Sequence, residues 1–253
     1  MSRLITRRRM LTGIGLAAPA VVIGCDRLGS SPSFRDIVLS SGEWLSSRVH
    51  RLIGSNALAR EFDPDQMSPV FRTNGNTQPR SPVYRQHQVT RFVDWRLDVG
   101  GLVNTPRSYS LADLRGKASR TQITRHDCVE GWSAIGKWTG VPLRTLLHEV
   151  QLKPAARFIV FHCADDFRGT AYYESIDLID AFHPQTILAY GMNDGVLSVD
   201  HGAPVRLRVE RQLGYKQAKF IMGIEAVASI ADIGRGRGGY WEDVGFYDWY
   251  AGI

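Results

Sequence analysis

The chain has 253 residues, of which 43% are hydrophobic and 22% charged, so it can bury one substantial core. Its formal net charge is +6 at pH 7, but four arginines at the very start contribute to it, and the remainder carries only 6 − 4 = +2. So small a charge argues against a polyanionic partner such as nucleic acid.

Residues 1–25 predict an export signal, because a basic start precedes an apolar centre and small residues. The apolar stretch, residues 10–23, is shorter than the roughly 20 residues of a permanent membrane helix. Residues 6–11 (TRRRML) resemble the twin-arginine signal, which exports folded proteins. Cys25 ends a sequence typical of a bacterial lipoprotein box, so we expect a lipid anchor there; alternatively, Cys25 only ends an uncleaved apolar anchor.

Residues 26–60 predict a polar tether followed by an amphipathic helix over residues 36–53, which we expect to pack on the domain. One domain should occupy residues 61–253. It begins with chain rich in proline, asparagine and glycine over residues 60–90, which predicts irregular structure of the kind that often lines a site.

The rest of the chain mixes short strands with short helices without a repeating strand–helix alternation, so we expect an α+β fold. Ser110 should cap one helix. The expected helices cover residues 111–114 and 142–150, and the expected strands cover residues 95–99, 157–163, 186–190 and 205–209.

Two cysteines remain after Cys25, namely Cys128 and Cys163, and in an oxidising compartment they could form a disulfide. Cys128, however, lies among charged residues, and Arg125 and His126 should favour its thiolate, a strong ligand for a soft or high-valent metal. Zinc bound by these cysteines with His126 and His162 is the chemical alternative, but the paired Cys-x-x-Cys spacing is missing. The lack of Cys-x-x-Cys-His excludes c-type haem.

The segment around Cys128 resembles that around the molybdenum-ligating cysteine of the sulfite oxidase superfamily. It is particularly similar to the prokaryotic branch that contains the periplasmic protein-methionine-sulfoxide reductase. The resemblance covers about residues 66–228 and follows the family's order through the motifs at residues 125–133, 138–143, 169–176, 188–193, 200–206 and 214–219.

The resemblance implies a sulfite-oxidase-type molybdopterin-binding domain that performs oxygen-atom or two-electron transfer on an S-oxide or related substrate, with Cys128 ligating molybdenum. It implies that Tyr172 lies beside the metal and that Arg125 binds a substrate oxyanion or lowers the thiol pKa. The residues that it implies for binding molybdenum–molybdopterin, besides Cys128, are Asn74, Thr77, Gln78, Cys163, His201, Arg206, Gln217, Ala218 and Lys219.

The chain departs from sulfite oxidases because their immunoglobulin-like dimerisation domain and haem domain have no counterpart in it. We therefore expect a monomer that acts on a substrate other than sulfite and exchanges electrons with a membrane-bound b-type cytochrome. The alternative is a non-catalytic exported lipoprotein with a Cys128–Cys163 disulfide and a ligand-binding surface. The aromatic segment at residues 240–250 should cover the domain, and residues 234–239 should form a flexible loop.

Overall fold

A computed structural model describes residues 32–54, 57–245 and 247–253. The predicted export signal and Cys25 lie outside these residues. The boundary between the two compact units of the chain falls between Ser46 and Ser47. Within the described ranges, no helix combines the length and apolarity needed to cross a membrane.

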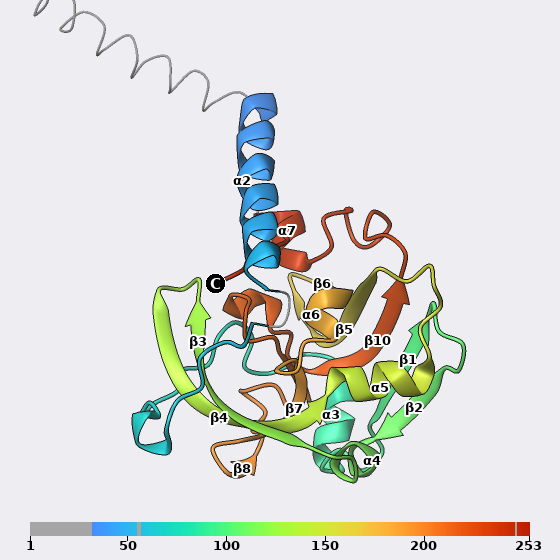
Figure 1. The fold of residues 1–253 in the computed structure, drawn as a ribbon. Helices are drawn as coiled ribbons and strands as arrows, with labels where there is room; N and C mark the ends of the chain where they lie inside the picture. The colour runs from blue at the N-terminus through green and yellow to red at the C-terminus, as the bar shows by residue number, and fades with distance from the viewer. Residues whose placement is uncertain (1–31, 55–56, 246) are drawn as a thin grey trace, which may run out of the picture. The chain divides into compact units, whose positions relative to one another are not determined.

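Helices and strands alternate irregularly along the chain (Figure 1). The α-helices are α2 (Pro32–Ile53), α3 (Pro82–Val89), α4 (Leu111–Arg115), α5 (Leu143–Val150), α6 (Leu178–Ala181) and α7 (Tyr240–Gly245), with 3-10 turns η1 (Pro64–Gln66) and η2 (Gly214–Lys216). The strands are β1 (Arg96–Gly101), β2 (Arg107–Ser110), β3 (Arg120–Cys128), β4 (Trp132–Pro142), β5 (Phe158–Phe167), β6 (Thr170–Asp177), β7 (Ile187–Met192), β8 (Gly195–Val196), β9 (Arg206–Arg208) and β10 (Ile221–Val227).

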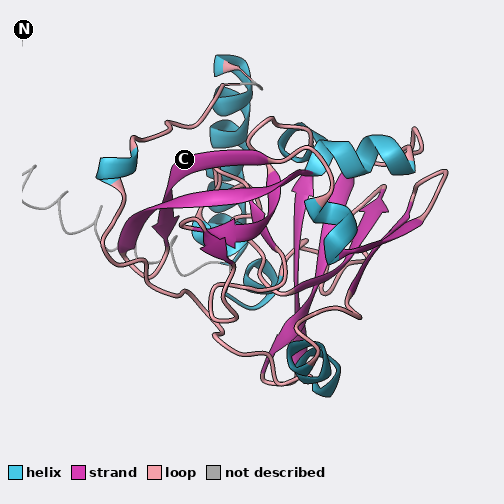
Figure 2. Cartoon of the chain, turned by 90° about the horizontal axis from the view of Figure 1, so that it is seen from below, coloured by secondary structure: helices cyan, strands magenta, loops and turns pink. Residues whose placement is uncertain are grey.

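The strands form two five-stranded sheets, which Figure 2 shows from below. One sheet has the order β2-β1-β10-β5-β6, with β1 and β10 parallel and the other neighbours antiparallel. The other is built on the long β3–β4 hairpin and continues through β7 to β8 and β9. The hairpin turn pairs Cys128 with Trp132, so Cys128 is the last residue of β3.

Apolar side chains from both sheets meet in the main core, and a smaller second cluster contains Trp138, Ile187, Ala189 and Leu197. Leu97, Phe161 and Ile224 from the first sheet belong to the same buried cluster as Val141 and Leu188 from the second. Helix α5 adds its buried residues Leu143, Leu146, Leu147 and Val150, whose three- and four-residue spacing puts them on one helical face.

The predicted α+β class is confirmed, as is the capping of α4, since the Ser110 hydroxyl accepts a hydrogen bond of 3.0 Å from the Asp113 N–H. The expectation of irregular chain up to residue 90 is wrong for residues 82–89, which form α3. There, Pro82 occupies the first turn, where a proline costs no helical hydrogen bond, and Ser81 caps the helix.

The predicted N-terminal helix exists as α2, but the expectation that its apolar residues pack is wrong for Val49 and Leu52, which are exposed. Polar contacts hold this end of the helix instead. Arg51 pairs with Asp177 at 2.6 Å, and the ring of His50 lies within hydrogen-bond distance of the Tyr250 hydroxyl.

Candidate active site

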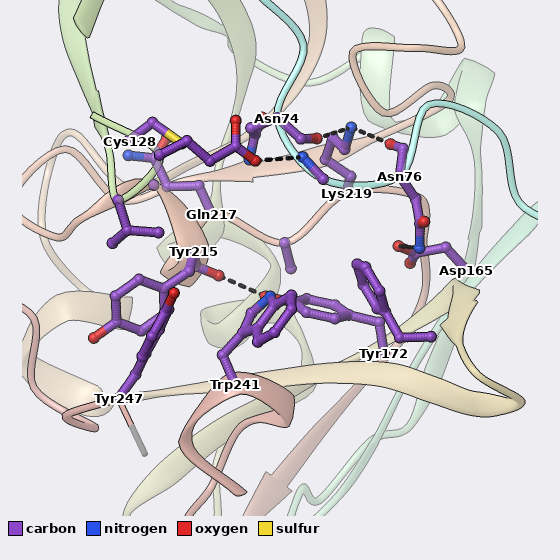
Figure 3. A pocket seen from close by; sticks show the side chains of 16 residues that line it. Asn74, Asn76, Cys128, Asp165, Tyr172, Tyr215, Gln217, Lys219, Trp241 and Tyr247 are labelled. Carbon is purple, nitrogen blue, oxygen red and sulfur yellow. Dashed lines mark hydrogen bonds between the residues drawn. The ribbon is translucent and has the colours of Figure 1, made fainter. Parts of the chain in front are cut away.

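A cavity of about 170 Å³ opens beside the β3–β4 turn (Figure 3). Segments distant in sequence meet there, namely the irregular chain before α3, the β3–β4 turn, β5, β6, η2 and the C-terminal segment. The cavity is lined by Asn74, Gly75, Asn76, Cys128, Val129, Glu130, Asp165, Phe167, Tyr172, Gly214, Tyr215, Gln217, Ala218, Lys219, Trp241 and Tyr247.

Cys128 reaches the cavity because side chains alternate along β3. His126 and Cys128 point inward, and the Cys128 side chain stays accessible only from the cavity, at 9% relative exposure. Burial raises the pKa of the Cys128 thiol, and Arg206 opposes this shift only in part. Burial, Arg208 and Arg206 lower the pKa of His126 well below its usual range, so His126 is neutral.

The structure places Arg125, predicted to act at the site, outside the cavity wall. The same alternation that turns Cys128 inward turns Arg125 outward, where its Nε donates to Asp127 at 2.9 Å. Arg125 does not line the cavity and is more than half exposed. The expected stabilisation of the thiolate by Arg125 and His126 is therefore absent, since one points away and the other is uncharged.

Two buried cations lie at the cavity, Lys219 in its wall just before β10 and Arg206 behind the wall on β9. The Lys219 ammonium donates only to backbone carbonyls, of Asn74 at 2.7 Å, Asp200 at 2.9 Å and Asn76. Arg206 donates to the carbonyls of His201 at 3.0 Å and Gln217 at 3.4 Å. Among the residues that the structure describes, neither cation has a carboxylate partner in an ion pair.

Burial lowers the pKa of Lys219 to about 7, and the nearby charge of Arg206 is the next cause. Burial lowers the pKa of Arg206 to about 9, with the charge of Arg208 as the next cause. Asp165 and Asp200 act on Lys219 and Glu210 acts on Arg206, but none of them forms an ion pair with either cation within the described ranges. A buried charge without a directly paired counter-charge is unfavourable, so this region favours an anion. The Arg206 Nε is also buried without a hydrogen-bond partner among the described residues. These features fit the phosphate-bearing tail of the cofactor that the family resemblance implies.

Close packing at Gly202 also fits an anionic cofactor tail beside Lys219 and Arg206. Gly202 has a φ of +108°, and a Cβ there would lie 2.9 Å from the Cβ of Lys219. Only glycine therefore lets the loop after His201 approach Lys219 and present backbone groups beside the cations.

The loop at residues 74–78 lines the cavity only with its first residues. Asn74 and Gly75 line it, and Asn76 donates to Asp165 at 3.0 Å. Thr77 and Gln78 do not line it, which corrects the prediction for both. The chain has already turned outward there, and Gln78 bonds instead to Gln88 on α3 at 2.6 Å.

Three further predicted residues lie behind the wall rather than in it. Arg206 is fully buried, and the His201 ring is within 3.3 Å of the Phe71 carbonyl oxygen. Cys163 is buried in the main hydrophobic cluster near Tyr172, and burial raises its pKa well above the usual range. Six of the predicted residues do line the cavity, namely Asn74, Cys128, Tyr172, Gln217, Ala218 and Lys219.

Tyr172 lines the cavity, but its hydroxyl donates to the Tyr215 carbonyl at 2.6 Å, so its proton is directed into the wall. Asp165, which sequence reasoning missed, lies two residues after Cys163 on the same face of β5. Its Oδ1 is buried without a partner among the described residues, and burial raises its pKa to about 6 against the opposing effects of Asn76 and Lys219. Strand alternation from Cys163 was the signal that could have identified it.

The two alternatives for the cysteines are not realised in the described part of the chain. Cys128 and Cys163 are both free thiols, so the disulfide of the lipoprotein alternative is wrong. The zinc set is not assembled either, because His162 points to the opposite face of β5 from Cys163 and lies 3.0 Å from Glu225. No cluster of three or more His, Cys, Asp or Glu side chains suited to a metal occurs in the described ranges.

The C-terminal segment covers the domain as expected, and it also contributes Trp241 and Tyr247 to the cavity wall, which sequence reasoning missed. The expectation of a flexible loop at residues 234–239 is wrong. Asp243 accepts hydrogen bonds from the N–H groups of Arg235 at 2.7 Å and Arg237 at 3.0 Å, and these bonds fix the loop.

Comparison with known proteins identifies the family of the chain. The family model described as the oxidoreductase molybdopterin binding domain matches residues 84–232. A putative protein-methionine-sulfoxide reductase subunit YedZ1 of Azospira oryzae is 40% identical over 195 residues, covering 76% of this chain and 70% of the relative. The protein-methionine-sulfoxide reductase catalytic subunit MsrP of Xanthomonas axonopodis is 31% identical over 243 residues, covering 89% and 71%.

MsrP of Ralstonia nicotianae is 38% identical over 178 residues, covering 66% of this chain and 50% of the relative. Among solved structures, the sulfane dehydrogenase SoxCD of Paracoccus pantotrophus matches 54% of this chain and 39% of its own, with 23% identity and a TM-score of 0.49. By the family match and the first two relatives, the chain belongs to the oxidoreductases with a molybdopterin-binding domain, the sulfite oxidase superfamily.

Proposed function

We propose that the chain reduces an organic S-oxide, of the kind found in methionine sulfoxide, at molybdenum ligated by Cys128. The observation that carries this proposal is the accessible Cys128 thiol in a cavity backed by the uncompensated cations Arg206 and Lys219. The relatives named as protein-methionine-sulfoxide reductases support the choice of substrate. The bound molybdenum cofactor would supply the two-electron redox couple.

The protein's residues have separable tasks in this reaction. Arg206, Lys219 and the backbone of Gln217 and Ala218 would bind the anionic tail. Reduction of a sulfoxide consumes two electrons and two protons and yields a sulfide and water. Asp165 can hold a proton at its unpartnered Oδ1 near neutral pH, so we assign it the supply of a proton to the departing oxygen.

A substrate screen tests the reaction. The holoenzyme, reduced by a viologen dye, would be offered sulfoxides, N-oxides and sulfite, the last with an electron acceptor. We expect turnover of sulfoxides above the other classes. Oxidation of sulfite as the dominant activity would contradict the proposal.

We further propose that the protein is exported by the twin-arginine route, is lipid-anchored at Cys25, and as a monomer receives electrons from a membrane-bound b-type cytochrome. A shared membrane would raise the effective concentration of the two proteins and let a weak docking surface suffice. A leader that keeps the twin-arginine signal but replaces the lipoprotein cysteine should lower cellular turnover and leave dye-driven turnover unchanged. Unchanged cellular turnover would reject the tethered partner.

A further inference from the structure

The wall of the cavity opposite Lys219 is aromatic, and two of its rings come from chain beyond the residues that the family model matches. Trp241 and Tyr247 lie beyond residue 232, where the family match ends, yet both line the cavity. Their rings stack at 5.8 Å with an interplanar angle of 24°, and Phe167 and Tyr215 extend the surface with ring distances of 5.2 Å to Trp241 and 4.9 Å to Tyr247.

This wall is firmly anchored rather than laid loosely over the cavity. Glu242, next to Trp241, is fully buried and pairs with Lys216 at 2.6 Å. Asp243 accepts from the Tyr173 hydroxyl as well as from the loop at residues 234–239. Farther along, the Trp249 indole N–H donates to Ser175 at 2.8 Å. These bonds fix the backbone on both sides of the wall, so the rings present a pre-formed surface.

The cavity therefore has two chemically different sides, which Figure 3 shows facing one another. Asn74, Asn76, Asp165 and Lys219 form the polar side with Cys128. The aromatic side can bury alkyl groups, and aromatic rings make favourable contacts with polarisable sulfur. A compact oxyanion would gain nothing from these rings and would lose hydration against them.

We propose that Trp241 and Tyr247 determine specificity by binding the alkyl groups that flank the sulfur of an organic sulfoxide. This inference rests on the proposed function, because it assigns a role to the wall in the same reaction. Asp165 on the polar side then meets the sulfoxide oxygen, Lys219 remains with the cofactor, and the aromatic side excludes substrates that lack an alkyl group.

A homologous series of alkyl methyl sulfoxides tests the assignment on the holoenzyme. For the wild type, kcat/KM should rise roughly three- to fourfold with each methylene added, up to the length of the wall. Trp241→Ala should flatten this dependence, whereas Trp241→Phe should keep most of it. Val244→Ala, at an exposed position on the same helix that does not line the cavity, is the matched control and should keep the full dependence.

Equilibrium binding provides a readout independent of turnover. Dialkyl sulfones have the same alkyl groups but no reducible sulfoxide, and calorimetric titration of the holoenzyme should show the same chain-length dependence of Kd. Tyr247→Leu gives a second test if Trp241→Ala fails to fold, as judged by its molybdenum content and circular dichroism.

The outcomes separate the two proposals. A chain-length dependence that survives Trp241→Ala and Tyr247→Leu unchanged, in turnover and in sulfone binding, would overturn the wall assignment. Absence of turnover for every sulfoxide, together with sulfone binding that depends on Trp241, would reject sulfoxide reduction but retain the wall as an alkyl-binding surface.

Discussion

Two lysines on one short segment, Lys216 and Lys219, are both buried, yet their surroundings differ in charge. Lys216 contacts Glu174 and Glu242, whose carboxylates raise its pKa although burial lowers it. Lys219 contacts only backbone carbonyls, and its pKa falls to about 7. The first lysine is neutralised within the fold, whereas the second has no ion-pair partner among the described residues, which is the arrangement that our proposed anion-binding role requires.

The same contrast separates the arginines of β9. Arg208 forms a buried pair with Glu210 at 2.6 Å, while Arg206 has no carboxylate partner among the described residues. Both guanidinium groups contact the Trp138 ring, Arg208 at 4.3 Å and Arg206 at 5.0 Å from its centre. Along this strand, too, one cation is paired and the other is not, in the part of the chain that the structure describes.

The largest expected effect comes from removing Cys128, the proposed metal ligand beside Arg206 and Lys219. Cys128→Ser replaces a soft thiolate by a harder and much less acidic hydroxyl. We expect a folded protein whose dye-driven turnover falls at least about a hundredfold, by analogy with the loss of a directly reacting group. An unchanged turnover and an unchanged Mo(V) resonance would show that Cys128 is not the ligand.

Asp165→Asn should have the next largest effect, since the amide cannot donate a carboxyl proton. We expect kcat to fall about a hundredfold, the usual scale for a lost general acid. Because the pKa of Asp165 is raised to about 6, wild-type kcat should decline as pH rises through this value, and the variant should lose that limb. A pH profile that is identical in both proteins would contradict this role.

Lys216→Met should destabilise the fold, because Lys216 is the buried cation that pairs with Glu174 and Glu242. It leaves two buried carboxylates without their cation, so we expect the free energy of unfolding to fall by about 3–5 kcal/mol, measured by urea denaturation. Lys219→Met, the same substitution at the uncompensated lysine, is the control and should leave the unfolding free energy of the cofactor-free protein unchanged or higher. Equal losses in both variants would remove the distinction between the two lysines.

A further effect concerns the pH dependence of stability. Because the folded pKa of Lys219 lies near 7 and the unfolded value near 10.5, the folded protein binds fewer protons between these values, and its stability should rise across that range. Unfolding of the cofactor-free wild type and of Lys219→Met, followed from pH 7 to 10, should show this rise only in the wild type. Parallel curves would mean that Lys219 titrates normally.

The sequence predicts features that depend on neighbouring residues better than features that depend on contacts between distant segments. The motif around Cys128 and the α+β class were accessible from the sequence, because both depend on neighbouring residues. Arg125 was misplaced because proximity in sequence was taken for proximity in space, although one strand sends Arg125 and Cys128 to opposite faces.

The features that no local pattern predicts are those that depend on long-range contacts. Trp241 lines the cavity next to Glu242, which pairs with Lys216 on a segment distant in sequence. The sequence likewise shows Lys216 and Lys219 as equivalent, since their different partners, Glu174 and the carbonyls of Asn74 and Asn76, lie far away along the chain.

The most direct test of the account is the molybdopterin content of the two lysine variants, measured per folded chain by molybdenum analysis and pterin fluorescence. The anion-binding role predicts that Lys219→Met retains about ten- to a hundredfold less cofactor after dialysis, while folded Lys216→Met retains the wild-type amount. Equal retention in Lys219→Met and the wild type, or a greater loss in Lys216→Met, would contradict the assignment of the uncompensated cations to the cofactor.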